Sequence, residues 1–234
     1  IILFDIRGHG KSAPSPAPLT YSLIAEDIKQ LLDLLNIEKA YICGYSTGGG
    51  IALEAMLNYP DRFYGGILLS AMSEVSDWRL QARLITAISL TAAKAKRMMS
   101  AAISWGNADM NRTFANLYRG AMNGTSENMK QYYYASLVYN CTSRLKHLNL
   151  PQLLIYGEKD KYFKRYAQIL HNELPESSLI FIKGVHHQLP TKASDQMNRL
   201  LSSWVQLQQE NPDASSVQFR FPFEEGQEET YIMV

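Results

Sequence analysis

The sequence AYICGYSTGGG, residues 40–50, places a serine between two glycines directly after a short apolar run. The residues that follow, 47–58, put Ile51, Ala52, Ala55 and Met56 at helical spacing. The pattern predicts a strand, a sharp turn and a helix, with the Ser46 hydroxyl exposed at the carboxyl end of the strand. Crowding in such a turn predicts that both flanking positions, Gly44 and Gly48, must be glycine. We expect Ser46 to be a nucleophile, the alternative being a chance flexible turn.

A helix that begins directly after Ser46 directs its partial positive charge and its first N–H groups toward that serine. The N–H of Thr47 comes first. The sequence therefore predicts that Thr47 contributes to an oxyanion hole, which binds the negative charge that forms on a substrate carbonyl oxygen.

Strand-like and helix-like runs alternate on both sides of this turn. Apolar strand-like runs occupy residues 1–6, 40–43, 66–70, 153–156 and 179–182, and amphipathic helices are predicted around residues 24–35, 47–58, 163–174 and 197–207. Such alternation predicts an α/β fold with a mostly parallel sheet flanked by helices.

The segment 73–147 shows only helical patterns and is predicted to be an inserted helical cap. We expect the α/β core to comprise residues 1–72 and 148–208, and residues 209–234 to form an acidic C-terminal tail. Within that tail Val217, Phe219 and Phe221 alternate with polar positions, so 217–221 is either an edge strand that docks on a sheet or part of a disordered extension.

A serine hydroxyl needs a base and an orienting acid to act as a nucleophile at neutral pH. Among the five histidines, only His186 and His187 follow the last strand-like run, and we favour His187 because the run after it anchors the next helix. The acid is expected at the end of another strand. Asp160 is the candidate there, with Glu158 as the alternative.

Composition excludes several classes of function. The chain has 234 residues, of which 23 are Lys or Arg and 22 are Asp or Glu, so its net charge of +1 lacks the basic character of a nucleic-acid-binding protein. The most apolar stretch, 85–103, contains Lys94, Lys96 and Arg97, which argues against a membrane span. No metal-ligand spacing or dinucleotide fingerprint is present, so no cofactor is expected, and the two unpaired cysteines fit a cytoplasmic protein.

The tripeptide Gly10-Lys11-Ser12 resembles the end of a phosphate-binding P-loop, but Asp5 stands where that motif requires its first glycine. The prolines that follow also prevent the helix that would bind the phosphate. A structural turn built on Gly8 and Gly10 is the preferred interpretation.

Four motifs in order resemble those of the α/β-hydrolase superfamily, in particular its single-cap esterases and lactonases. They are residues 5–12 (DIRGHGKS), 44–48 (GYSTG), 151–160 (PQLLIYGEKD) and 184–187 (GVHH). The resemblance implies a nucleophile at Ser46, an acid at Asp160 and a base at His187, because alignment of the last motif selects His187 over His186.

The resemblance also implies elements that this sequence does not contain. In the family, further strands and a His-Gly loop precede the 5–12 motif, and that loop supplies a second oxyanion N–H. We therefore expect an N-terminally truncated fold whose first strands are missing, with residues 1–6 forming a strand in the middle of the sheet.

Two classes of function follow from these expectations. The first is a serine hydrolase that cleaves a small ester, thioester or lactone through an acyl-enzyme, and aromatic and methionine residues in the cap favour an apolar acyl group. The second is a non-catalytic or truncated hydrolase-fold protein with a binding role. A cofactor-free lyase or acyltransferase that uses the same three residues is a further alternative. The expected partner is a small-molecule acyl substrate, and the oligomeric state is left open.

Overall fold

The computed structural model describes residues 1–93, 95–210 and 231–233, and it divides into two compact units. One unit comprises Ile1–Ile24 and Glu74–Tyr139, and the other comprises Ala25–Ser73 and Asn140–Val234. The helical segment predicted as a cap thus groups with the first 24 residues of the chain, which the sequence had assigned to the core.

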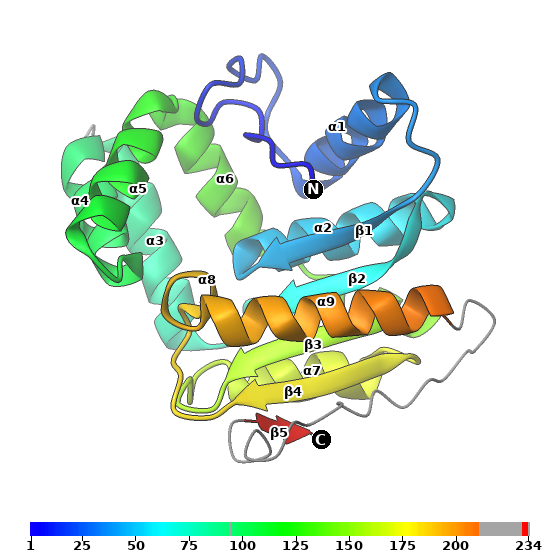
Figure 1. Cartoon of the computed structure of the whole chain (residues 1–234). Coiled ribbons are helices and arrows are strands. Elements are labelled where there is room, and N and C mark those ends of the chain that lie inside the picture. Colours follow the sequence, from blue (N-terminus) through cyan, green and yellow to red (C-terminus); the bar gives the residue numbers. More distant parts are fainter. Residues whose placement is uncertain (94, 211–230, 234) are drawn as a thin grey trace. The chain divides into compact units, whose positions relative to one another are not determined.

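The second unit contains a sheet of five strands in the order β1-β2-β3-β4-β5 (Figure 1). Strands β1 (Ala40–Tyr45), β2 (Phe63–Leu69), β3 (Gln152–Gly157) and β4 (Ser177–Ile182) are parallel, and β5 (Tyr231–Met233) pairs antiparallel with β4. The predicted mostly parallel sheet is therefore confirmed. Because the first four strands run in one direction, their carboxyl ends share one edge of the sheet.

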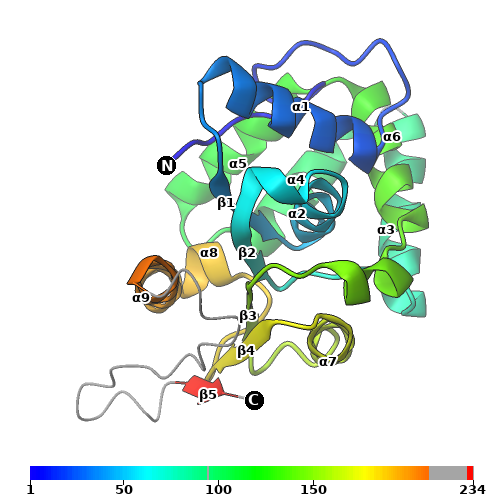
Figure 2. The same ribbon diagram turned by 90° about the vertical axis from the view of Figure 1, so that its right-hand side faces the viewer.

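Helices cover both faces of this sheet (Figure 2). Helices α2 (Thr47–Asn58) and α7 (Lys164–Glu173) lie on one face, and α8 (Leu189–Lys192) and α9 (Ser194–Glu210) lie on the other. Side chains that point to the α9 face form one buried cluster, which includes Ile67, Leu69, Leu153, Ile155, Ile180, Ile182, Leu189, Met197, Leu200 and Trp204. Burial of this cluster from water is the main stabilisation that holds α9 on the sheet.

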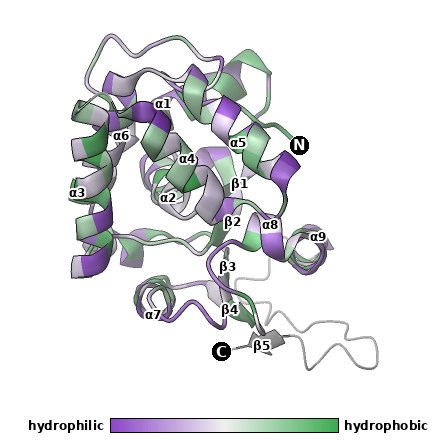
Figure 3. Ribbon diagram, turned by 90° about the vertical axis from the view of Figure 1, so that its left-hand side faces the viewer, coloured by the Kyte–Doolittle hydropathy of each residue, from purple (hydrophilic) through white to green (hydrophobic). Residues whose placement is uncertain are grey.

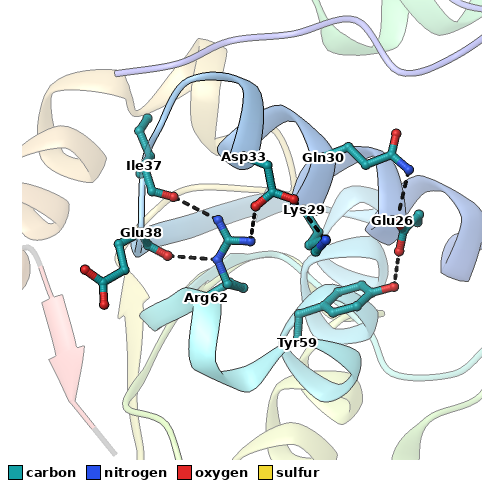
Figure 4. A network of polar contacts seen from close by, with 8 residues as sticks. All are labelled: Glu26, Lys29, Gln30, Asp33, Ile37, Glu38, Tyr59 and Arg62. Atoms are coloured by element: carbon teal, nitrogen blue, oxygen red, sulfur yellow. Dashed lines mark hydrogen bonds and ion pairs between the residues drawn. The ribbon is translucent and has the colours of Figure 1, made fainter.

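Polar contacts join α1 (Tyr21–Leu34) and the residues just before β1 to the turn that follows α2 (Figure 4). Arg62, in the 3₁₀ turn η1 (Pro60–Arg62), donates to the carbonyl oxygens of Ile37 and Glu38 and forms an ion pair with Asp33. The Tyr59 hydroxyl donates to the Glu26 carboxylate. These contacts join α1 to the turn that follows α2.

The first unit is mainly helical. It contains α3 (Trp78–Ala92), α4 (Lys96–Asn107), α5 (Asn111–Asn123) and α6 (Ser126–Val138), and a short 3₁₀ turn of the second unit, η2 (Thr142–His147), follows them. Hydrophobic and hydrophilic residues alternate along α3 and α5 (Figure 3), as expected of amphipathic helices. Side-chain caps fix two helix starts, since Asp77 accepts from the N–H groups of Arg79 and Leu80, and Thr125 accepts from Asn128. No helix in the described ranges combines the length and the apolar character needed to cross a membrane.

One expectation about strands is wrong, and one strand was not predicted. Residues 1–6 do not form a strand, because a strand requires hydrogen bonds to a neighbouring strand and no strand of the described chain pairs with them. Strand β5 was not predicted, because its three residues follow an acidic run that suppresses the strand pattern. The proposed edge strand at 217–221 lies outside the described residues.

Candidate active site

Ser46 is the single residue between the end of β1 and the start of α2. Its backbone angles are φ 54° and ψ −121°, in a region that non-glycine residues rarely adopt. Such a conformation costs of order 1–3 kcal/mol and persists only where surrounding contacts impose it. The strand–turn–helix geometry predicted from the sequence is therefore present, and it holds Ser46 at the carboxyl edge of the sheet.

Close packing explains two of the glycines around Ser46. A Cβ atom on Gly44 would overlap the carbonyl of Gly48, and one on Gly49 would overlap the side chain of Ala71 on the next strand end. Gly48 differs, because a Cβ atom there would meet no other atom within 4 Å. The expectation that crowding requires glycine at Gly48 is therefore wrong, and Gly49 is the second crowded position.

A continuous hydrogen-bonded chain joins Ser46, His187 and Asp160. The Ser46 Oγ lies 3.0 Å from Nε2 of His187, and Nδ1 of the same ring lies 2.7 Å from Oδ2 of Asp160. An ionised carboxylate can only accept a hydrogen bond, so Nδ1 carries the proton and the neutral imidazole presents an unprotonated Nε2 to the serine hydroxyl. The Asp160 side chain is 6% exposed and the His187 side chain 22% exposed, which strengthens their interaction relative to one in water.

Parallel topology explains how residues 141 positions apart in sequence meet here. Ser46 follows β1, Asp160 follows β3 and His187 follows β4, so all three lie at the carboxyl ends of their strands. In open α/β sheets this edge is the usual location of ligand sites.

Backbone contacts join the loop that carries Asp160 to the loop that carries His187. The N–H of Lys159 donates to the carbonyl of Val185 at 2.8 Å, and a Cβ atom on Gly157 would lie 2.5 Å from that same oxygen. The alternative acid, Glu158, instead accepts the N–H of Gly184 at 2.9 Å. The two loops are thereby fixed relative to each other, and Glu158 contributes to this linkage rather than contacting His187.

Two aromatic rings also contact the His187 imidazole. The ring centroid of Phe163 lies 4.2 Å from that of His187, and the centroid of Tyr45 lies 5.3 Å away. Burial, and secondarily the charge of Asp160, raises the pKa of the Tyr45 hydroxyl, so this group stays protonated near neutral pH. Sequence reasoning missed both contacts, although Tyr45 belongs to the motif and Phe163 follows Asp160 by three residues.

The structure also locates His186, the other histidine of the pair, and Thr47, the candidate for the oxyanion hole. The side chain of His186 is exposed, and His187 is the histidine that bridges Ser46 and Asp160. Thr47 is the first residue of α2. The helix of twelve residues directs its N-terminus toward the position of Ser46.

The loop that resembled a P-loop is a closed turn in the structure. The Asp5 carboxylate accepts the N–H of Lys11 at 2.9 Å, and the Ser12 hydroxyl donates to the Asp5 carbonyl. Gly8 and Gly10 have positive φ values of 72° and 52°. A carboxylate thus occupies the position where a P-loop binds phosphate. Within the described residues, no cluster of three or more metal-ligating side chains is found.

Comparisons with known proteins agree with this architecture. Residues 1–90 match the family model described as the alpha/beta hydrolase fold. The chain is 26% identical over 194 residues to 3-oxoadipate enol-lactonase 2 of Acinetobacter baylyi, which covers 80% of this chain and 71% of that protein. It is 24% identical over 211 residues to the human serine hydrolase BPHL, which covers 88% of this chain and 69% of that protein.

A solved structure gives the same result at the level of fold. The esterase EaEST of Exiguobacterium antarcticum superposes with a TM-score of 0.77 at 20% identity, and the match covers 86% of this chain and 80% of that one.

Proposed function

Since the chain belongs to the α/β-hydrolase superfamily, we propose that it is a serine hydrolase that acts on ester bonds through an acyl-enzyme formed on Ser46. The observation that carries this proposal is the position of His187, whose two ring nitrogens lie within hydrogen-bonding distance of Ser46 and Asp160. The names of the relatives, an enol-lactonase and a serine hydrolase, support an ester or lactone as the substrate class.

In the first half of the proposed reaction, the Ser46 Oγ attacks the carbonyl carbon of the substrate. Its proton moves to Nε2 of His187, and the Asp160 carboxylate stabilises the imidazolium that results. The carbonyl oxygen becomes an oxyanion, which the N–H of Thr47 and the N-terminus of α2 stabilise. The tetrahedral intermediate then expels the alkoxide or thiolate, which takes the proton from Nε2.

In the second half, water replaces the leaving group. His187 removes a proton from that water as it attacks the acyl carbon, and a second tetrahedral intermediate forms. Its collapse releases the carboxylic acid, and Ser46 regains its proton from Nε2. Every proton in this sequence passes through Nε2 of His187, which exchanges it with Ser46, the leaving group or the attacking water, so the steps as written balance without a cofactor. The proposed substrate carries a small, apolar acyl group, as expected from the sequence.

The decisive experiment measures hydrolysis of p-nitrophenyl acetate and butyrate together with covalent labelling by a fluorophosphonate. We expect the label on Ser46, located by mass spectrometry of peptides. Ser46→Ala should lower kcat by about 10⁶ while leaving the thermal unfolding temperature unchanged.

Ser202→Ala, at an exposed serine of α9, is the matched control and should behave like the wild type. Folded Ser46→Ala protein that retains hydrolysis would exclude Ser46 as the nucleophile. If the wild type is labelled but transfers its acyl group to an added alcohol rather than to water, the acyltransferase alternative replaces the hydrolase.

A further inference from the structure

The end of strand β2 lies between the strand that leads to Ser46 and the strand that leads to Asp160. Two residues, Ser70 and Ala71, follow that strand directly. Both are completely buried. Their position in the middle of the carboxyl edge places them between the strand that leads to Ser46 and the strand that leads to Asp160.

Ser70 has an unusual backbone conformation, with φ at 43°. In the described chain, the other non-glycine residues with positive φ are Asn36, a residue type that tolerates this region, and Ser46 itself. Strained residues tend to cluster at functional sites, where surrounding contacts impose the conformation. The strain at Ser70 therefore indicates that specific contacts hold this residue in place.

Contacts of Ser70 and of its two neighbours in sequence reach Ser46, strand β3 and the loop that carries His187. The N–H of Ser46 donates to the carbonyl of Leu69 at 2.8 Å, and the N–H of Ser70 donates to the carbonyl of Ile155 on β3 at 2.8 Å. The Tyr156 hydroxyl donates to the carbonyl of Ala71, also at 2.8 Å. Finally, the Ser70 hydroxyl donates to the carbonyl of His187 at 3.2 Å.

The contact from the Ser70 hydroxyl supports His187, the residue that links Ser46 to Asp160. His187 lies in a loop between β4 and α8, outside any helix or strand. Its carbonyl accepts two hydrogen bonds, one from the N–H of Leu189 at the start of α8, at 2.9 Å, and one from Ser70. The Ser70 hydroxyl is therefore the contact that fixes the His187 backbone to the sheet rather than to its neighbours in sequence.

We propose that Ser70 is a positioning residue, whose buried hydroxyl holds the His187 backbone so that the imidazole bridges Ser46 and Asp160. The inference rests on the proposed function, since it assigns Ser70 a role in the same reaction. Displacement of a reacting group by about 1 Å can lower a rate of this kind by as much as 10²-fold. Ser70 itself contacts no substrate, because it is fully buried.

The test compares Ser70→Ala with Ser73→Ala. Ser73 is equally buried, three residues further along, and its hydroxyl lies 2.7 Å from that of Thr142, away from the three loops. Both changes remove one buried hydroxyl hydrogen bond, so both should lower the thermal unfolding temperature. We expect Ser70→Ala alone to lower kcat and the fluorophosphonate labelling rate about 10-fold with KM unchanged.

A second variant separates loss of the hydroxyl from strain in the backbone. Ser70→Gly also removes the hydroxyl but adopts positive φ without cost, so it should fold even if Ser70→Ala does not. Its labelling rate should fall as in Ser70→Ala. Wild-type labelling rates in both variants would overturn the role of Ser70, as would an equal loss of rate in Ser73→Ala.

A spectroscopic measurement separates this inference from the proposed function. The imidazole ¹⁵N shifts of His187, assigned with a His187→Gln variant, report whether Nδ1 carries the proton and donates its hydrogen bond to Asp160. We expect this tautomer in wild type and Ser73→Ala, and a mixture of tautomers in Ser70→Ala. If Ser46→Ala retains hydrolysis, the proposed function fails, but the ¹⁵N shifts of His187 still decide whether Ser70 positions that residue. Unchanged shifts in Ser70→Ala, or absence of the Nδ1–H tautomer in the wild type, would overturn it.

Discussion

A Cβ atom on Gly44 would overlap the carbonyl oxygen of Gly48 and lie 2.7 Å from the Cα of Gly49, whereas one on Gly48 would meet no atom within 4 Å. The two glycines that flank Ser46 therefore have different roles. Gly44 permits the close approach of strand β1 to the first turn of α2. Gly48 satisfies the motif without being required by packing in the described structure.

This difference predicts opposite effects of one methyl group. Gly44→Ala forces backbone atoms apart and should destabilise the protein by about 1–3 kcal/mol, as overpacking of a core does. Gly48→Ala adds a better helix former in the first turn of α2 and should leave stability unchanged or raise it by up to about 1 kcal/mol. Urea unfolding of both variants measures the two effects. Equal destabilisation would show that Gly48 is also constrained.

The two adjacent histidines provide a second test. His187→Ala should reduce kcat by about 10⁶, as expected for a member of a cooperating triad, because it removes the base from Ser46. His186→Ala changes an exposed side chain and should retain most of the activity. Steady-state hydrolysis of p-nitrophenyl acetate distinguishes them. A reversed result would shift the assignment of the base by one residue.

The two carboxylates of the Glu158–Asp160 loop provide a third test. Asp160→Asn preserves the shape of the side chain but can stabilise the wrong His187 tautomer, so kcat should fall by about 10⁴. Glu158→Gln keeps an acceptor for the N–H of Gly184 and should leave kcat within about twofold of the wild type. Measurement of kcat for both variants decides the assignment, and a larger loss in Glu158→Gln would make Glu158 the orienting acid.

Hydrophobic periodicity was sufficient to predict most of the central sheet and its helices. Helix α2 has the bounds that its apolar spacing predicts, and the runs at 153–156 and 179–182 lie within β3 and β4. Because the strands are parallel, the sequence alone also predicts that Ser46, Asp160 and His187 lie at the carboxyl edge of the sheet.

Features that depend on partners distant in sequence were not predicted. The run at residues 1–6 has a strand pattern but no strand pairs with it in the described chain, so pattern alone failed there. Ser70 was missed for a related reason. A serine after an apolar strand is common, and its positive φ and its bond to a carbonyl 117 residues away arise only in the folded chain.

A partly exposed ion pair gives a fourth prediction. Nη1 of Arg144 lies 2.9 Å from Oε2 of Glu54, whose side chain is only 5% exposed. Arg144→Met leaves the buried carboxylate with less compensation and should destabilise the protein by about 1–3 kcal/mol. Replacing both residues removes the charge as well, so the double variant Arg144→Met/Glu54→Met should be more stable than Arg144→Met alone. Chemical unfolding of the single and double variants tests this, and additive costs would contradict it.

The contacts around Arg62 predict how stability depends on pH. Hydrogen bonds from Lys29 and Arg62 lower the pKa of Asp33, and a hydrogen bond from the Tyr59 hydroxyl lowers the pKa of Glu26. A carboxyl group with a lower pKa in the folded state stabilises the fold above its unfolded pKa. That stabilisation is lost as the pH falls through the folded value. The relevant window therefore begins near pH 4 and extends downward.

Arg62→Met should lower the thermal unfolding temperature at pH 7, and the difference from the wild type should shrink as the pH falls below about 4 and Asp33 becomes protonated. It should not vanish, because Arg62 also donates to the carbonyl oxygens of Ile37 and Glu38, which do not titrate. Arg165→Met, at an exposed arginine of α7, is the control and should show no such dependence. Calorimetry at a series of pH values measures both variants. A difference that stays constant across this range would show that the ion pair with Asp33 contributes nothing and that the two carbonyl contacts account for the whole effect of Arg62.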